Sequence, residues 1–263
     1  MRVFLLGGTK DSINIIEHLK ANYDTFILTT TTTEYGARLA REGGSNETIA
    51  RPLPKDEIIR ILTETNFDLM VDATHPFASH ITQTCIDVAN QLNLAYIRFE
   101  RPTTNLENID TSNIHYVKSF DDAGKLIADE FDQCNVLHFA GANTMESILK
   151  YVSPDNFYPR ILKVESSIEK CEKLNVSPDH IISMKGAASK EENIELIEKY
   201  DAGVMITKES GEIGGVIEKI QAANEKNIAV IMIQRPKIDG LNKNSIVSNL
   251  EELDNKLKAF FKK

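Results

Sequence analysis

The sequence lacks the features that mark several classes of protein. Its three cysteines, Cys85, Cys134 and Cys171, are odd in number, far apart and not spaced as metal ligands. Reduced core thiols in a cytoplasmic protein are therefore expected. No apolar run approaches the ~20 residues that span a membrane, and the first residues enter glycines too early for a signal peptide. We expect a cytoplasmic protein without a membrane partner.

Positive charge is also scarce. The chain carries 30 Lys and Arg against 39 Asp and Glu, which gives a formal net charge of −9. An acidic protein has no general attraction for nucleic acid. Any anionic ligand must therefore be held by local basic groups. Low-complexity tracts and proline-rich linkers are missing too, and the sequence leaves the oligomeric state open.

What the sequence does contain is a regular alternation of short apolar runs and amphipathic segments. The runs typical of strands are 3–6, 25–29, 69–72, 95–99, 136–140, 157–164, 181–184, 204–207 and 228–233. The segments typical of helices are 11–21, 56–65, 77–92, 120–131, 190–199, 213–226 and 250–260. This order indicates an α/β fold of βαβ units, with parallel strands covered on both faces.

A polar segment at 103–113 has no periodicity and predicts a domain boundary. We therefore divide the chain into two lobes, residues 1–108 and residues 109–263.

An internal match supports two similar lobes. Residues 90–102, NQLNLAYIRFERP, match residues 224–236, NEKNIAVIMIQRP, at six of thirteen positions. Each stretch follows an Asp, an apolar strand ending in Thr, a polar loop and a helix. A chance likeness between two βαβ units is the alternative. If the repeat is genuine, Thr74-His75 corresponds to Thr207-Lys208.

The first apolar run leads through Gly7-Gly8-Thr9 into a helix. Glycines at this position let backbone N–H groups approach a phosphate at the helix amino terminus. The pattern is incomplete, because Ser12 stands where a third glycine is usual. A plain tight turn is the alternative explanation.

The second run ends in five threonines, residues 29–33. Sites selective for NAD usually carry an acid here, which binds the ribose hydroxyls. Hydroxyl groups would not repel a 2′-phosphate, so Thr30 and Thr31 favour NADPH over NADH. Arg38 is the nearest arginine along the chain. The strand propensity of threonine is the alternative explanation for the run.

The stretch LMVDATHPFASH, residues 69–80, ends a strand on a histidine. Ligands of open α/β sheets bind at the carboxyl ends of strands. Thr74 is therefore expected at the cofactor, and His75 beside the nicotinamide or as a proton donor near neutral pH. The alternative is a helix start with Thr74 or Ser79 as cap, Pro76 in the first turn and a structural histidine.

A metal site at His75, His80 and Cys85 is excluded by geometry. Steps of five residues leave successive side chains ~140° apart around a helix. These three side chains cannot converge on one ion, and we expect no metal site.

Several motifs together carry a family resemblance. They are GGT at 7–9, DATHPFA at 72–78, RFERP at 98–102, YPR at 158–160, KESGEIGG at 208–215 and QRP at 234–236. The chain resembles the precorrin-6A reductases of cobalamin biosynthesis, including the cobalt-precorrin-6A reductases. The motifs occur in order over nearly the whole chain.

The resemblance implies two Rossmann-like lobes with a cleft between them. Residues 1–108 are then the dinucleotide-binding lobe, and residues 109–263 form a second Rossmann-like lobe that contributes to substrate binding. The resemblance also implies NADPH-dependent reduction of one ring double bond in (cobalt-)precorrin-6A, which gives (cobalt-)precorrin-6B. The small-molecule partner is then a tetrapyrrole polycarboxylate, which requires basic groups. The residues expected to bind it are Arg98, Arg101, Arg160, Lys185, Ser210 and Arg235, with Lys208 as the counterpart of His75 in the second lobe. For each arginine a salt bridge is the alternative.

One segment departs from the family pattern. Where something close to MQGPF is expected, the chain reads MKGAA at 184–188. The change removes an amide, a proline and an aromatic side chain from a loop at a strand end.

Two other function classes remain open. One is a different NADP-dependent oxidoreductase on the same scaffold, because a fold does not determine a function. The other is a non-catalytic NADP(H)-sensing regulator. A regulator has little use for clustered Arg and Lys at strand ends, so the second lobe discriminates against it.

Overall fold

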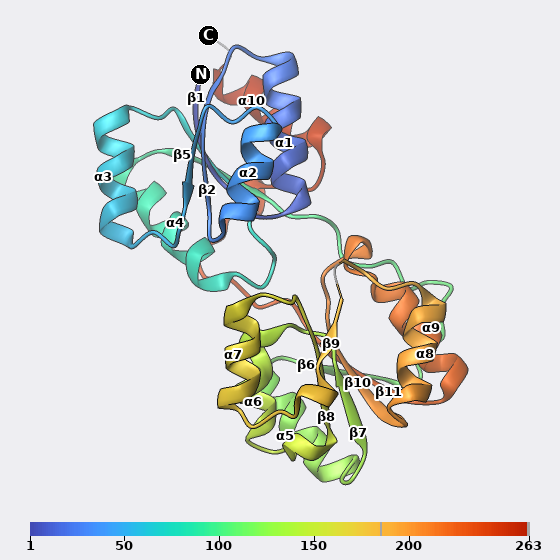
Figure 1. Cartoon of the computed structure of the whole chain (residues 1–263). Helices are drawn as coiled ribbons and strands as arrows, with labels where there is room; N and C mark the ends of the chain where they lie inside the picture. The colour runs from blue at the N-terminus through green and yellow to red at the C-terminus, as the bar shows by residue number, and fades with distance from the viewer. Residues whose placement is uncertain (185, 262–263) are drawn as a thin grey trace. The chain divides into compact units, whose positions relative to one another are not determined.

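The computed structural model describes residues 1–184 and 186–261 and consists of two compact units (Figure 1). Unit 1 is Met1–Pro102 with Pro236–Lys263, and unit 2 is Thr103–Arg235. The chain passes from unit 1 to unit 2 directly after Pro102 and returns between Arg235 and Pro236. Each crossing lies at one of the Arg-Pro pairs that end the internal match.

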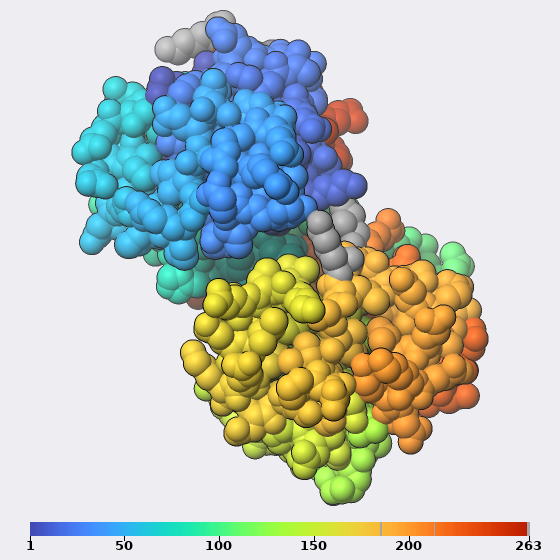
Figure 2. Space-filling view, in the orientation of Figure 1, coloured from blue at the N-terminus to red at the C-terminus, as the bar shows by residue number. Residues whose placement is uncertain are grey.

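The expected division at residues 108 and 109 differs from these units. The carboxyl-terminal segment belongs to unit 1, because strand β12 (Ile246–Val247) pairs with β5 (Ala95–Phe99). Helix α10 (Leu250–Phe261) packs Leu253 and Leu257 into the same core. In Figure 2 this red segment lies beside the blue amino-terminal region. A strand of two residues has no readable periodicity, so the sequence did not reveal this return.

Unit 1 is built on a parallel sheet of six strands in the order β12-β5-β4-β1-β2-β3, within the described residues. The remaining strands are β1 (Arg2–Leu6), β2 (Phe26–Thr31), β3 (Glu47–Ala50) and β4 (Leu69–Asp72). The helices are α1 (Lys10–Asn22), α2 (Glu34–Glu42), α3 (Lys55–Thr65) and α4 (Ser79–Leu92), in addition to α10. Alternate residues of β1 cover both faces: Val3 and Leu5 pack toward α1 and α10, and Phe4 and Leu6 toward α3 and α4.

Unit 2 repeats this plan with the order β6-β11-β10-β7-β8-β9, again parallel in the described part of the chain. Its strands are β6 (Ile114–Val117), β7 (Asn135–His138), β8 (Phe157–Ile161), β9 (Ile182–Ser183), β10 (Ala202–Lys208) and β11 (Ala229–Ile233). Its helices are α5 (Phe120–Glu130), α6 (Met145–Leu149), α7 (Glu165–Lys173), α8 (Lys190–Lys199) and α9 (Val216–Lys226). Figure 1 shows α8 and α9 on one face of the sheet, and α5, α6 and α7 on the other.

The strand order of each sheet reverses at one place. The reversal lies between β1 and β4 in unit 1 and between β7 and β10 in unit 2. Open parallel sheets bind ligands outside the carboxyl ends of the strands at such a point. The loops after β1, β4, β7 and β10 are therefore the places where a site is expected.

The parallel α/β fold predicted from the alternation is confirmed. The elements that the sequence did not predict are α2, β3, β6, α6, α7 and β12. They bury few large apolar side chains: the buried residues of α2 include Ala37 and Ala40, and the buried residue of α7 is Cys171. Among the described residues, no helix has the length and hydropathy to cross a membrane.

Strand pairing changes the details of the internal match. Leu69 of β4 pairs with Ala95, whereas Val204 of β10 pairs with Ala229. Ala95 and Ala229 are matched positions in the repeat. Leu69 is therefore equivalent to Val204, two residues further along than the sequence match placed it.

The correspondence of Thr74-His75 with Thr207-Lys208 is consequently wrong. By register, Thr207 stands where Asp72 stands in unit 1. The cause is the longer strand β10, whose register also shifts between Ala202 and Val204. A bulge of this kind adds a residue without changing the hydrophobic character of the strand, so the letters alone did not show it.

Candidate functional site

The loop between β1 and α1 is shaped for close backbone approach. Gly8 has φ +97°, and apart from the adjoining residues no described heavy atom lies within 4 Å of the place where a Cβ would stand. A Cβ on Gly7 would meet Thr29 Cγ2 at 3.0 Å and Ser12 Oγ at 3.1 Å. Ser12 is fully buried and fills the place of a third glycine. The open side of Gly8, at the amino end of α1, therefore offers a cradle for a phosphate.

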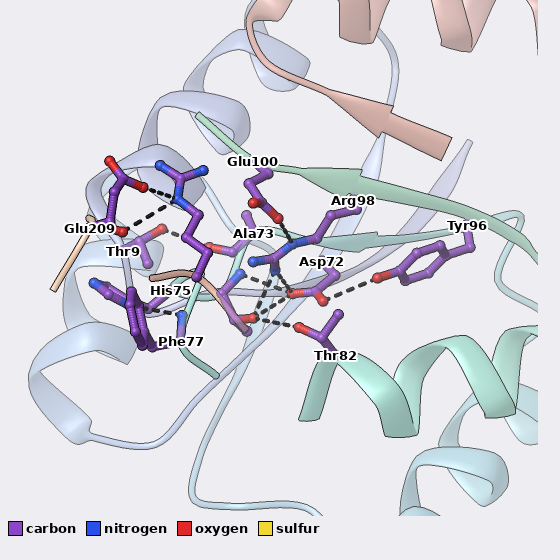
Figure 3. Close-up of polar contacts among 12 residues, drawn as sticks. Thr9, Asp72, Ala73, His75, Phe77, Thr82, Tyr96, Arg98, Glu100 and Glu209 are labelled. Carbon is purple, nitrogen blue, oxygen red and sulfur yellow. Dashed lines mark hydrogen bonds and ion pairs between the residues drawn. The ribbon is translucent and has the colours of Figure 1, made fainter. Parts of the chain in front are cut away.

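Thr9 connects this loop to the loop after β4. It is the N-cap of α1, and its Oγ1 accepts a hydrogen bond from the Ser12 N–H at 3.2 Å. The same hydroxyl donates to the Ala73 carbonyl at 2.7 Å (Figure 3). The Thr9 side chain thus holds the two loops of the strand-order reversal together.

The threonine run is partly used by the fold. Thr29 Oγ1 lies 2.7 Å from Ser45 Oγ, and Thr31 donates to the Thr33 carbonyl at 2.9 Å. Thr33 caps α2 by accepting from the Gly36 N–H. The hydroxyls of Thr29, Thr31 and Thr33 therefore have structural roles.

His75 lies directly after β4 and stabilises its own turn. Its Nδ1 accepts a hydrogen bond from the Phe77 N–H at 3.2 Å, so a neutral ring carries its proton on Nε2. Helix α4 has Ala78 as N-cap without a side-chain bond. Neither Thr74 nor Ser79 caps the helix, and the helix-start explanation is wrong in that form.

A buried network holds this turn in place (Figure 3). Arg98 is 1% exposed, and its Nη1 donates to Asp72 Oδ1 at 2.8 Å and to Thr74 Oγ1 at 3.0 Å. Asp72 also accepts from the hydroxyls of Thr74 at 2.6 Å and Tyr96 at 3.1 Å. Glu100 lies 3.2 Å from Arg98 Nε. Arg98 is therefore a core cation, and the expectation that it binds substrate is corrected.

These loops line one cavity of about 390 Å³ in unit 1. The lining residues named by the sequence are Gly7, Gly8, Thr9, Thr30, Thr31, Thr74 and His75. Arg51, directly after β3, also lines it, whereas Arg38 lies on α2 with Glu42 as its partner. The sequence missed Arg51 because strand β3 was not predicted. The volume is in the range of small-molecule sites.

Unit 2 collects cations at its own strand ends. The Arg160 guanidinium lies 4.5 Å from the centre of the Phe139 ring, and its Nη1 lies 3.7 Å from Met184 Sδ. Burial lowers the pKa of Arg160 and of Lys208, the last residue of β10. Both are among the predicted substrate or catalytic residues.

Lys219 of α9 was not among the residues expected at the site. It is 3% exposed, and its Nζ donates to Thr207 Oγ1 at 3.1 Å and to the Gly214 carbonyl at 2.8 Å. Burial, and then repulsion from Arg160 and Lys208, lower the Lys219 pKa to about 7. Its place on the apolar face, three residues after Val216, was a readable signal.

His138 was also left without a role. It ends β7, is fully buried, and its Nε2 lies 2.9 Å from Thr144 Oγ1. Burial lowers its pKa to about 3. The ring is therefore neutral at physiological pH.

Two of the other predicted residues form ion pairs with a residue of the same unit. Arg101 forms an ion pair with Asp11 of α1, and Arg235 forms one with Glu209. Ser210 is buried, and a Cβ at Gly214 would collide with its Oγ. Lys185 lies outside the described residues. Among those described, no three His, Cys, Asp or Glu side chains are placed to hold a metal ion.

Comparisons with known proteins agree with this geometry. The family model described as precorrin-6x reductase CbiJ/CobK matches residues 2–258. The chain is 41% identical over 240 residues to a cobalt-precorrin-6A reductase of Methanocaldococcus jannaschii. The aligned residues cover 91% of this chain and 92% of the relative. The chain is 36% identical over 254 residues to one of Methanothermobacter thermautotrophicus, covering 96% and 82%.

A solved structure described as CobK precorrin-6A reductase has the same fold. It superposes with a TM-score of 0.76 at 17% identity, covering 99% of this chain and 98% of that one. The resemblance found in the motifs is thereby confirmed. With the family model and these relatives spanning nearly its whole length, the chain belongs to the precorrin-6x reductase family CbiJ/CobK.

Proposed function

We propose that this protein reduces one ring double bond of cobalt-precorrin-6A with NADPH, giving cobalt-precorrin-6B in cobalamin biosynthesis. Family membership supports an oxidoreductase that acts on a precorrin with a nicotinamide cofactor. The cobalt form is favoured because both archaeal relatives are cobalt-precorrin-6A reductases. The single observation that carries the proposal is the glycine-lined cavity at the strand-order reversal of unit 1.

The residues of this cavity fit a dinucleotide. Gly8 leaves its backbone open, and the amino end of α1 favours negative charge beside it. No acidic side chain is among the described residues that line the cavity. These features support NADPH in preference to NADH. Such a cofactor would supply the hydride, while the chain supplies position and exclusion of water.

His75 is the residue that we assign to the reacting end. Its Nδ1 accepts a hydrogen bond from the Phe77 N–H, and the residue lines the cavity. A proton donor must be within hydrogen-bond reach of the atom it protonates, and imidazole has a suitable pKa near neutrality. The Asp72–Arg98–Thr74 network positions this turn.

Arg160 and Lys208 are proposed to bind carboxylates of the macrocycle. They are half-buried cations on β8 and β10, two strands of unit 2 that are separated by β7, and carboxylates would compensate their charge. Ser210 lies two residues after Lys208 and is proposed to assist. Arg101 and Arg235 already pair with Asp11 and Glu209, so we give them a smaller role.

The decisive experiment follows NADPH absorbance in an anaerobic mixture of protein and cobalt-precorrin-6A. Oxidation of NADPH with formation of cobalt-precorrin-6B is expected, and metal-free precorrin-6A and NADH serve as comparisons. Turnover of neither precorrin would favour another NADP-dependent oxidoreductase. Nucleotide binding without turnover of any tetrapyrrole would favour a sensor. A cytoplasmic location, expected from the cysteines, stays a prediction.

A further inference from the structure

Arg51 occupies a defined place beside the end of strand β2. Thr31, the last residue of β2, pairs with Ala50 of β3, and Arg51 comes directly after Ala50. In dinucleotide sites the adenosine ribose lies at the end of the second strand. Arg51 is therefore next to the place of the ribose 2′-position, although it is far from that strand in sequence.

The charge balance of the cavity depends on Arg51. Arg51 is the one Lys or Arg among the described residues that line the cavity, and none of them is acidic. An NAD-selective site would place a carboxylate there, but here Thr30 and Thr32 line the cavity instead. The nearest acid beyond them, Glu34, is paired with Arg41.

The Arg51 guanidinium is held in position. Its Nη1 and Nη2 donate to the two carboxylate oxygens of Glu57, at 2.7 and 2.6 Å. Arg60 also donates to Glu57, at 3.3 Å. The Arg51 side chain is 53% exposed, so its remaining N–H groups can reach a ligand. Two arginines around one carboxylate leave a net positive group that suits a phosphate.

We infer that Arg51 reads the 2′-phosphate of NADPH and sets the preference for NADPH over NADH. This inference rests on the proposed function and adds the residue that selects the cofactor. Glu57 acts as the positioning residue that presents the guanidinium. A side chain that meets only the 2′-phosphate affects nucleotides with that group and spares those without it.

The test compares Arg51→Gln with Arg38→Gln. Both variants remove one positive charge, but Arg38 lies on α2 outside the cavity, with a side chain 60% exposed. Calorimetric titration of the complete protein with 2′,5′-ADP and with 5′-AMP needs no tetrapyrrole substrate. For Arg51→Gln we expect affinity for 2′,5′-ADP to fall roughly tenfold to a hundredfold, as for loss of a charge-assisted hydrogen bond. Affinity for 5′-AMP should not change, and Arg38→Gln should bind both as wild type does.

Other outcomes separate the failures. If wild type prefers 2′,5′-ADP and Arg51→Gln keeps that preference, the assignment of Arg51 is overturned while NADPH dependence stands. If wild type binds both nucleotides equally, both the inference and the proposed cofactor preference fail. Equal weakening of both nucleotides in Arg51→Gln would show a structural role and would also overturn the assignment. In turnover, kcat/KM for NADPH should fall and that for NADH should not.

Discussion

Units 1 and 2 end a central helix in the same way. Asn93 after α4 and Asn227 after α9 both adopt left-handed backbone, with φ 49° and 53°. Each Asn N–H donates to the carbonyls three and four residues earlier, and each is followed by a parallel strand that ends the repeat. Asparagine tolerates this conformation better than most residues. The repeated Asn-x-x-Asn pattern is therefore a repeated helix stop.

The same comparison exposes a difference in buried charge. Cys85 precedes Asn90 by five residues, as Lys219 precedes Asn224. In unit 1 the cysteine is neutral, and burial raises the pKa of its thiol. In unit 2 the equivalent position carries an amine.

On the strands beside these helices the buried charges lie in unit 1 and the uncharged residues in unit 2. Unit 1 places Arg98 opposite Asp72, a charge with its counter-charge. Unit 2 has Met232 opposite Thr207, and Lys219 reaches that threonine from the helix. The same scaffold thus carries a neutralised ion pair in unit 1, where the pair holds a loop. In unit 2 it carries Lys219, which Arg160 and Lys208 repel, and such a group of like charges favours an anionic ligand. Shared topology does not imply shared chemistry.

The largest effect is expected from breaking the pair in unit 1. Arg98→Met would leave Asp72 buried without its counter-charge, and such losses cost about 3–5 kcal/mol of unfolding free energy. Denaturant unfolding measures it. Arg38→Met, which removes an exposed partner of Glu42, should cost less than about 1 kcal/mol. Equal small losses in both variants would show that the pair does not stabilise unit 1.

A second pair of variants separates the roles of the two strand ends. His75→Asn keeps an acceptor for the Phe77 N–H but removes the ring nitrogen that could give a proton. We expect the melting temperature to change little and kcat to fall roughly a hundredfold or more. Lys208→Met should instead raise KM, with added salt weakening the wild-type advantage. A lower melting temperature with normal kcat for His75→Asn would return His75 to a structural role.

The glycine loops allow a matched test of nucleotide binding. Gly8 and Gly141 both have positive φ, +97° and +85°, and open space where a Cβ would stand. Valine at either position strains the backbone similarly. Gly8→Val should weaken NADPH binding about tenfold or more, whereas Gly141→Val in unit 2 should leave it unchanged. Fluorescence titration with NADPH is the readout, and equal affinities in the two variants would place the cofactor elsewhere.

The last effect concerns pH and Lys219. Its folded-state pKa of about 7 lies below the ordinary value of 10.5. Between these pH values the unfolded chain holds a proton that the folded chain has released, so stability rises with pH across this window. Lys219→Met should flatten that rise in denaturant unfolding measured from pH 7 to pH 10. Lys226→Met, on the same helix but with a side chain 30% exposed, should retain it. An unchanged slope in Lys219→Met would contradict the lowered pKa.

The sequence by itself determined the α/β class, most central strands, the glycine loop and the family. These features are local: apolar runs mark strands such as Leu69–Asp72, and glycines mark a turn that needs positive φ. The Asn and Arg-Pro repeats were readable for the same reason. Each depends on a few neighbouring residues.

Only the tertiary structure decided the charge partners and the unit boundaries. Arg98 looked like a ligand-binding cation until its guanidinium was placed inside the core with Asp72. Arg51 entered the site only once β3 was placed beside β2, and β12 revealed that the chain returns to unit 1. These facts depend on pairing between distant segments and on burial. A strand as short as β3 or β12 has too few residues to show a hydrophobic period. The charge partner of a side chain and the dielectric environment around it are set by the fold, and a local stretch of sequence therefore does not reveal them.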